Sequence, residues 1–248
     1  MDKLLYVAMS GAKETLRAQA ANTHNLANSS TTGFKADLSA FQSRAVTGPG
    51  YASRVYATDQ TVGWDHTIGS VQQTGNPLDL AIHGQGFLAV QDASGKEAYT
   101  RGGDLHVDPT GQLLTATGLP VLGDNGPISI PPSTSITVGT DGTISIVPLG
   151  QSPQTAANVA RIKLVNPPLD SVQRGTDGLF RTTDGTPAVA DASTTVSSGS
   201  LESSNVDLAS CMVNMIELAR RFDLQVKALH TAEEDGAASS KLLQSSGG

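Results

Sequence analysis

The side chains that could perform chemistry in this chain are five histidines, one cysteine and 23 acidic residues. A zinc site needs histidines and cysteines at short, regular spacings, and a structural disulfide needs two cysteines. Cys211 has no second cysteine in the chain, and the histidines show no such spacing. The sequence therefore predicts no metal site, no cofactor site and no internal disulfide. The histidines are His24, His66, His83, His106 and His230.

Three kinds of short motif contain residues that are typical of active or binding sites. The segment "HGQGF", from His83 to Phe87, precedes a strand-like run, whereas a phosphate-binding glycine turn must open a helix. Ser10 lies in a helical pattern without the strand and turn of a nucleophile elbow. The segments "DPTG" at Asp108 and "TDG" at Asp141 and Asp184 lack the remaining ligands of a calcium loop. We therefore predict tight turns at the glycine and aspartate motifs, and no enzyme.

Composition and charge disfavour binding to nucleic acid, a secretory signal and a membrane span. With 248 residues, of which 38% are hydrophobic, the chain can bury a core as one domain or two. Its net charge is −7 and it has no basic run, which disfavours binding to nucleic acid. Charged residues interrupt the first helical pattern, and no later stretch reaches the roughly 18 apolar residues of a membrane span. The sequence therefore predicts neither a secretory signal nor a membrane span.

Heptad spacing predicts one helix at each end of the chain. Apolar or small residues recur in steps of four and three from Met1 to about Asn28, and again from Asn205 to about Glu234. Ser204 and Asp207 resemble a capping pair at the start of the second helix. We predict that both seams pack against helices. The seam positions are Leu5, Met9, Ala12, Leu16 and Leu26 in the first helix, and Leu208, Met212, Met215, Ala219, Phe222, Val226 and Leu229 in the second.

The chain between the two helices has a different pattern. Short apolar runs alternate with turn signals from about Asn76 to Ser200, which predicts a β-rich domain. The segment before it has few large apolar residues and predicts an extended arm or hairpin. The predicted fold class is α+β, with a terminal-helix domain (1–34 plus 201–248), an arm (35–75) and a β-rich domain (76–200). The pattern is compatible with helices that pack between chains and with a two-helix lid on the chain's own β domain.

The first helical pattern ends in the polar run "NLANSSTTGFK", which begins at Asn25. Asn28 and Gly33 tolerate left-handed backbone angles, and Ser and Thr compete for backbone hydrogen bonds, so this run should stop a helix. It resembles the signature at the end of the N-terminal helix in axial proteins of the bacterial flagellum, the rod and hook family. The signature residues are Asn25, Asn28, Gly33 and Phe34. Three further segments, "GNPLDLAIHGQGFLAV", "YTRGGDLHVDPTGQLLTATGLPVLG" and "GSLESSNVDLASCMVNMIELARRFDLQVKALHTAEE", resemble other parts of the same family.

This resemblance covers most of the chain and implies a structural role. The opening "MDKLLYVAMSGA" and the ending "ARRFDLQVKALHTAEE" are more similar to the proximal rod branch than to the distal rod or hook. The resemblance implies a subunit of the basal-body rod in the periplasm, exported by the flagellar export apparatus without cleavage of a signal. Its partners would be copies of itself and other rod proteins. The terminal helices would line the channel of a hollow, helical drive shaft that transmits torque and allows export.

Three alternatives to a proximal rod subunit remain. Another axial protein, from the distal rod or the hook, would share the same segments. An enzyme acting on cell-wall glycan would need two carboxylates across a cleft, and no segment indicates such a pair. A secreted glycan-binding protein would have little stacking surface here, because only 4% of residues are aromatic.

The departures from the family pattern, His24 and His83, stand where other polar residues are expected.

Overall fold

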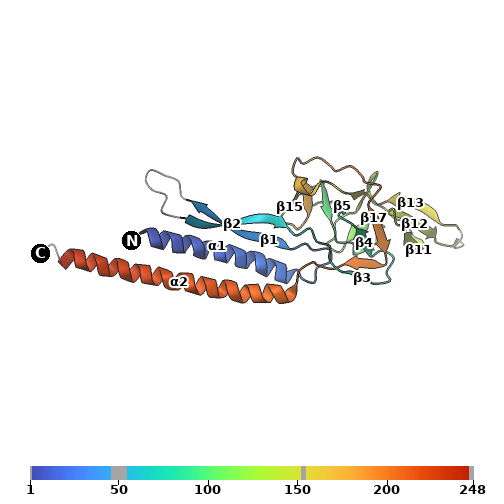
Figure 1. Cartoon of the computed structure of the whole chain (residues 1–248). Coiled ribbons are helices and arrows are strands. Elements are labelled where there is room, and N and C mark those ends of the chain that lie inside the picture. Colours follow the sequence, from blue (N-terminus) through green and yellow to red (C-terminus); the bar gives the residue numbers. More distant parts are fainter. Residues whose placement is uncertain (1, 46–54, 152–154, 246–248) are drawn as a thin grey trace. The chain divides into compact units, whose positions relative to one another are not determined.

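The protein combines two long helices with many short strands. The computed structural model describes residues 2–45, 55–151 and 155–245, and Figure 1 shows its helices and strands. This arrangement confirms the predicted α+β class. Two compact units can be distinguished: a helical unit (Met1–Asn28, Asp37–Trp64 and Val206–Gly248) and a β unit (Ser29–Ala36 and Asp65–Asn205). In the described ranges, neither helix has the length and apolar character required to cross a membrane.

The helical unit is built on α1 (Asp2–Ala27) and α2 (Leu208–Ser245), which lie side by side and run in opposite directions (Figure 1). A contact between Asn22 and Cys211 joins the last part of α1 to the first part of α2. At 38 residues, α2 is longer than α1, which has 26. It continues beyond Glu234, where the heptad pattern predicted its end. The residues that follow include several good helix formers, among them alanines and a lysine, so the helix continues without a heptad.

A hairpin completes the helical unit. Strand β1 (Asp37–Ala45) pairs antiparallel with β2 (Val55–Trp64), and the register shifts between Leu38 and Ser39. Strand β2 contacts α1. The hairpin lies within the segment 35–75, for which an arm or hairpin was predicted, and the residues at its tip lie outside the described ranges.

The β unit contains short antiparallel strands in several small sheets. A five-stranded sheet has the order β14-β5-β6-β16-β15, and a three-stranded sheet has the order β11-β12-β13. Strands from opposite ends of the unit also pair, β3 with β18 and β4 with β17. The strands are β3 (Val71–Gln73), β4 (Leu80–His83), β5 (Phe87–Gln91), β6 (Glu97–Thr100), β7 (Leu105–Val107), β8 (Leu113–Thr115), β9 (Leu122–Gly123), β10 (Gly126–Pro127), β11 (Ser133–Val138), β12 (Thr143–Pro148), β13 (Ala157–Arg161), β14 (Leu164–Val165), β15 (Val172–Arg174), β16 (Phe180–Thr182), β17 (Thr195–Ser198) and β18 (Ser200–Glu202), with a short 3-10 helix at Leu169–Ser171.

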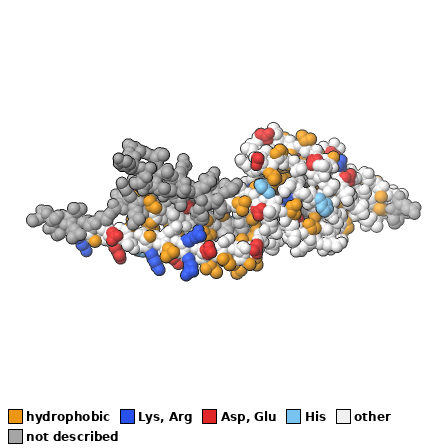
Figure 2. Space-filling view, viewed as in Figure 1, with side chains coloured by type: hydrophobic (Ala, Val, Ile, Leu, Met, Phe, Trp, Pro, Cys, Tyr) orange, Lys and Arg blue, Asp and Glu red, His pale blue; other side chains and the backbone are white. Residues whose placement is uncertain are grey.

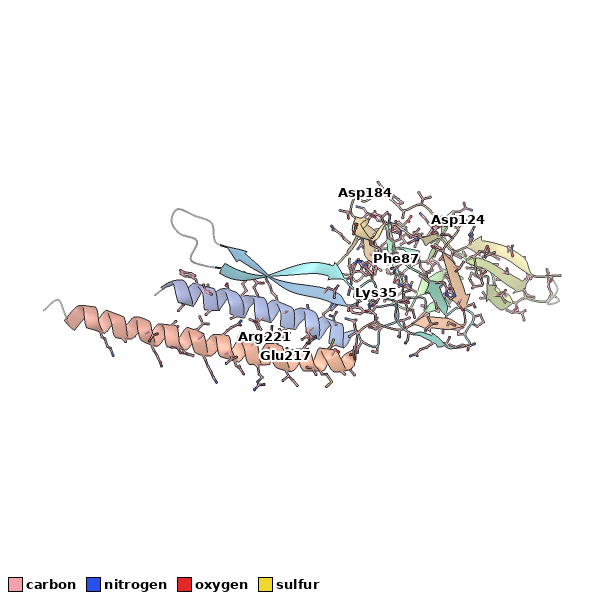
Figure 3. All side chains as sticks on the ribbon, viewed as in Figure 1. Lys35, Phe87, Asp124, Asp184, Glu217 and Arg221 are labelled. Atoms are coloured by element: carbon pink, nitrogen blue, oxygen red, sulfur yellow. The ribbon has the colours of Figure 1, made fainter. Side chains whose placement is uncertain are left out.

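The core of the β unit consists of aliphatic side chains from many of these strands, including Leu88, Leu113 and Ile144, which are fully buried. The rings of Phe87 and Phe180 contact each other with centroids 5.1 Å apart and planes tilted by 48° (Phe87 is labelled in Figure 3). Burying large apolar side chains is the main favourable contribution to the folding of such a unit. The β unit therefore has a core of its own.

The glycine and aspartate motifs form turns, as predicted. Gly84 has a φ of 81° in the turn between β4 and β5. The carboxylates of Asp108, Asp141 and Asp184 accept hydrogen bonds from residues two positions further along, at 2.9–3.1 Å. Bonds from neighbouring threonine hydroxyls, and then from backbone N–H groups, hold the pKa of each carboxyl below its usual value. These acids stabilise turns locally.

Candidate functional site

The face that α1 and α2 bury against each other is lined by small and polar side chains. Thr15 and Ala18 are 1% and 3% exposed, and Asn22 is also buried. The Asn22 side chain donates a hydrogen bond of 2.8 Å from Nδ2 to the carbonyl oxygen of Cys211. Cys211 is buried, and this burial raises the pKa of its thiol. It is therefore a small packing residue in the helix pair, as its place beside the seam predicted.

The exposed face of the same helix pair carries large apolar side chains. On α1, Tyr6, Met9 and Leu16 are 50–52% exposed. On α2, the residues that are 51–65% exposed are Leu208, Met212, Val213, Ile216 and Leu224. Figure 2 shows apolar side chains gathered on the part of α2 nearest its first residue, and charged ones farther along. Large apolar side chains that stay this exposed are typical of protein–protein interfaces.

The predicted seam positions lie mostly beside the buried face. The half-buried ones are Leu5, Ala12 and Leu26 on α1, and Met215, Phe222, Val226 and Leu229 on α2. The exposed ones are Met9 and Leu16 on α1, and Leu208, Met212 and Ala219 on α2. The buried line on α2 contains Cys211, Leu218 and Ala232, which the heptad pattern did not select. Packing of the seams between subunits stays a prediction.

Asp207 determines where α2 begins. Its carboxylate accepts hydrogen bonds from the backbone N–H of Ala209 at 3.0 Å and from the hydroxyl of Ser210 at 2.5 Å. The Ser210 hydroxyl and then the Ala209 N–H lower the pKa of the Asp207 carboxyl. The sequence prediction of a pair led by Ser204 is therefore wrong in detail. Because α2 starts at Leu208, Asp207 itself is the capping residue.

Two asparagines of the signature turn act at the end of α1. The Asn25 side chain donates to the carbonyl oxygen of Asp37 at 3.0 Å and accepts from the N–H of Asp37 at 2.8 Å. It thereby joins α1 to the start of β1. Asn28 donates from Nδ2 to the carbonyl oxygen of His24 at 2.9 Å. His24 Nδ1 in turn lies 2.7 Å from Asp37 Oδ2.

The helix ends at Ala27, as the polar run predicted, without a left-handed residue at Asn28. No described residue other than glycine has a positive φ, so Asn28 does not take the left-handed conformation that we considered for it. Its side chain instead donates to the carbonyl oxygen of His24, which also accepts the backbone N–H of Asn28 at 3.2 Å. The end of α1 is therefore capped by a side-chain amide.

Gly33 and Phe34 belong to the β unit. Gly33 has a φ of 67°, and a Cβ atom on it would lie 2.3 Å from the carbonyl carbon of Arg101. Its N–H donates to the carbonyl oxygen of Glu202 at 2.8 Å. The guanidinium carbon of Arg174 lies 4.4 Å from the centroid of the Phe34 ring, a favourable cation–π distance. Only glycine fits at position 33, because both the backbone angle and the close approach exclude a side chain.

A buried ion triad follows immediately in the β unit. It consists of Lys35, Arg101 and Glu202, whose side chains are 1–2% exposed. Lys35 Nζ lies 2.7 Å from Glu202 Oε1, and Arg101 reaches Oε2 from Nε at 2.9 Å and from Nη2 at 2.5 Å. Figure 3 labels Lys35 among the side chains of this unit. Charge-assisted hydrogen bonds of this length are strong, and here they are removed from water.

The remaining donors of Arg101 hold the "HGQGF" turn. They bind the carbonyl oxygens of Gly84 at 2.9 Å, Gly86 at 2.7 Å and Ile82 at 3.3 Å. All five N–H donors of Arg101 therefore have an acceptor. The glycine motif that could have suggested a phosphate site thus supplies carbonyl groups to a buried arginine.

The surroundings of the triad shift the pKa values of Lys35 and Glu202. Burial lowers the pKa of Lys35, and the Glu202 carboxylate opposes this effect. Burial alone would raise the pKa of Glu202, but hydrogen bonds from Arg101 and then Lys35 outweigh it and bring the pKa below its usual value. Glu202 is therefore ionised in the folded unit at neutral pH. Sequence reasoning missed the triad because residues 35, 101 and 202 have no common period.

Comparison with known proteins connects these features. Three family models match the chain: "Flagella basal body rod protein" at residues 5–35, "Flagellar hook protein FlgE/F/G D1 domain" at 81–146, and "Flagellar basal body rod FlgEFG protein C-terminal" at 197–245. The flagellar basal-body rod protein FlgF of Escherichia coli (strain K12) is 44% identical over 252 residues, covering 99% of this chain and 100% of the relative. The chain belongs to the flagellar basal-body rod protein family.

Other members of the rod family align over nearly the same length. FlgF of Caulobacter vibrioides is 36% identical over 250 residues, which cover 98% of each chain. The rod protein FlgG of Bacillus subtilis (strain 168) is 32% identical over 257 residues, covering 94% of this chain and 96% of the relative. Each matched segment of this rod-family chain contributes one member of the triad: Lys35, Arg101 and Glu202. The triad therefore joins the three segments by which the family is recognised.

The described part of the chain contains no group of three or more histidine, cysteine or acidic side chains that could hold a metal ion. A candidate functional surface is the exposed apolar face of the helix pair. We name this face the outer stripe and define it by the apolar residues that are at least half exposed. They are Tyr6, Met9 and Leu16 on α1 and Leu208, Met212, Val213, Ile216 and Leu224 on α2.

Proposed function

We propose that this chain is a structural subunit of the proximal part of the flagellar rod and assembles helically through its terminal helices. The observation that carries the proposal is the outer stripe, where eight large apolar side chains remain at least half exposed. The names of the FlgF relatives support the place of the chain in the basal-body rod. Partners of the stripe would be further copies of this chain and other rod proteins.

The energetics of the stripe favour an assembled state. Complete burial of one such side chain contributes about 1.5–3 kcal/mol. Since these side chains are already half covered, each can contribute roughly half of that when a neighbour packs on it. Association costs rigid-body freedom, but a subunit in a helical assembly meets several neighbours and collects such contributions repeatedly. In the isolated helix pair, much of the apolar area that a neighbour could bury therefore stays exposed to solvent.

The assembly proposal also assigns roles to the parts of the chain. The helices α1 and α2 would form the layer that lines the channel, and the β unit would form the outer part. The finished tube would act as a hollow drive shaft in the periplasm that transmits torque and allows other subunits to pass. Each subunit would reach it through the flagellar export apparatus.

The decisive experiment places a charge on the outer stripe. Ile216 is 65% exposed, so Ile216→Asp should leave the folded chain intact and place a carboxylate where a neighbour would pack. We expect circular dichroism and the melting temperature of the purified chain to stay at wild-type values, and motility and recovery of the protein in purified basal bodies to be lost.

The matched control is the adjacent Glu217→Gln. Glu217 is exposed and lies 3.7 Å from Arg221 on the same helix (both labelled in Figure 3), a surface pair that contributes about 0–1 kcal/mol. This variant should swim and assemble normally. Incorporation of Ile216→Asp at the wild-type level would show that the outer stripe is not an assembly surface.

A further inference from the structure

A polar contact lies between the two helices in the middle of α1. The Thr15 hydroxyl oxygen is 2.9 Å from Gln225 Oε1 and 2.9 Å from the carbonyl oxygen of Gly11, and Thr15 is 1% exposed. A hydroxyl has one proton and can donate to one of these oxygens. If the terminal amide of Gln225 is rotated by 180°, its NH2 group donates to the Thr15 hydroxyl. The Thr15 hydroxyl then donates to the carbonyl oxygen of Gly11, so the amide, the hydroxyl and the carbonyl are all paired.

Gly11 provides the space for this contact. A glycine in the middle of a helix is destabilising relative to alanine. A Cβ atom at position 11 would lie 3.0 Å from one terminal atom of the Gln225 amide and 3.5 Å from its Cδ. Gly11, a weak helix former, thus occupies the position in α1 against which the Gln225 side chain packs. A second polar contact, from Asn22 to the carbonyl oxygen of Cys211, lies further toward the end of α1.

Buried polar contacts between helices favour one register over others. A shift of one helical turn would separate the half-buried Gln225 amide from the buried Thr15 hydroxyl, and a polar group that loses its partner at a helix interface is destabilised. Apolar contacts between helices tolerate such shifts more easily, and a single polar residue in a seam can fix the alignment of two helices. Competing alignments are available here, because Met9, Leu16 and Met212 offer exposed apolar surface.

We propose that Gly11, Thr15 and Gln225 form a register lock that pairs α1 with α2 of the same chain in one antiparallel alignment. The lock keeps the small polar face inside and the outer stripe outside. The helices of one chain therefore pair with each other, and the apolar residues stay available to a neighbour. The lock acts within one chain; only its benefit for assembly rests on the function proposed above.

The test measures the alignment directly in the purified full-length chain. Nitroxide labels are placed at Lys13→Cys and Arg221→Cys, both exposed positions, in a Cys211→Ala background. Pulsed electron resonance then gives the distribution of distances between the labels. We expect one narrow distribution for the chain with the lock intact. For Thr15→Val/Gln225→Leu we expect a broad or two-peaked distribution, although the melting temperature of the helical signal is maintained or higher.

Two single substitutions separate register from stability. Thr15→Val alone should lower the melting temperature because it leaves the glutamine amide poorly paired, and the double variant should recover it without recovering the narrow distribution. Thr23→Val is the matched control, since Thr23 is exposed and its hydroxyl bonds to the carbonyl oxygen of Gln19 at 2.8 Å. It should keep the narrow distribution.

Either of two results would overturn the lock. One is a broad distribution in the chain with Thr15 and Gln225 intact, and the other is a narrow, unchanged distribution in the double variant. The assembly proposal can fail separately. If Ile216→Asp assembles normally, the outer stripe loses its role, while the distance measurement still decides whether the lock exists.

Discussion

One carboxylate, that of Glu202, lies between two buried cations, Lys35 and Arg101. Removing its charge by Glu202→Gln leaves both cations buried without their shared partner, a change that typically costs about 3–5 kcal/mol. Lys35→Met instead leaves the Arg101–Glu202 pair and deprives the carbonyl oxygen of Thr67 of its 2.6 Å donor. We expect this second variant to cost only roughly 1–2 kcal/mol. Urea unfolding of both full-length variants measures the difference, and an equal or larger loss in Lys35→Met would refute this account of the triad.

The lowered pKa of Glu202 predicts how the triad responds to acid. The unfolded chain protonates this group near its ordinary value of 4.5, whereas the folded unit keeps it ionised to lower pH. The unfolded state then binds more protons, so the stabilisation is complete above pH 4.5 and decreases as the pH falls below that value. We expect the unfolding free energy of Glu202→Gln to decrease less steeply below pH 4.5 than that of the wild type. Parallel acid profiles of the two proteins would show that the carboxylate makes no such contribution.

At the scale of elements, the end of α1 depends on Asn25. Asn25→Ala removes both hydrogen bonds with the Asp37 backbone in a buried position, which should cost about 1–3 kcal/mol. We expect faster hydrogen exchange at the Asp37 amide, because its acceptor is lost. Asn28→Ala is the control, since the Asn28 side chain donates to the carbonyl oxygen of His24 in the last turn of α1. An unchanged exchange rate at Asp37 in Asn25→Ala would exclude the connection between α1 and β1.

The elements show what local patterns could and could not predict. Heptad spacing predicted both helices, because periodicity is a local property of the sequence. It selected large apolar residues such as Met9 and Met212, whereas the pair buries smaller residues such as Ala18 and Cys211. The rule that large apolar residues lie inside fails at these positions, and under the assembly proposal their burial is left to other chains. The spacing of Gly11, Thr15, Ala18 and Asn22, in steps of four, three and four, was the local signal of the buried line.

The triad could not have been predicted in the same way. Its members come from segments more than sixty residues apart, and no local period relates residues 35, 101 and 202. The signature turn was recognised through Asn25, Asn28 and Gly33, but its neighbour Lys35 gains its role only through the fold. Long-range ion pairs of this kind follow from topology, which sequence periodicity does not specify.

At the scale of the whole molecule, the β unit is closed by its two ends. Strand β3 pairs with β18 and β4 pairs with β17, so the first and last strands of the unit are neighbours. The N–H of Gly33, near the start of the unit, binds the carbonyl oxygen of Glu202, near its end. The side chain of Asn205 likewise accepts from the N–H of Ala36 at 2.8 Å. Contacts between residues so distant in sequence form late in folding, because long loops must close first.

This closure sets an order of events for a chain that is made from its N-terminus. Until residue 202 has been synthesised, Lys35 and Arg101 have no shared carboxylate, and β3 and β4 have no partner strands. The triad and these two strand pairs therefore cannot form through most of translation. The unit can close only when about four-fifths of the 248 residues have been added. Completion of the β unit therefore depends on Glu202, which is synthesised shortly before α2.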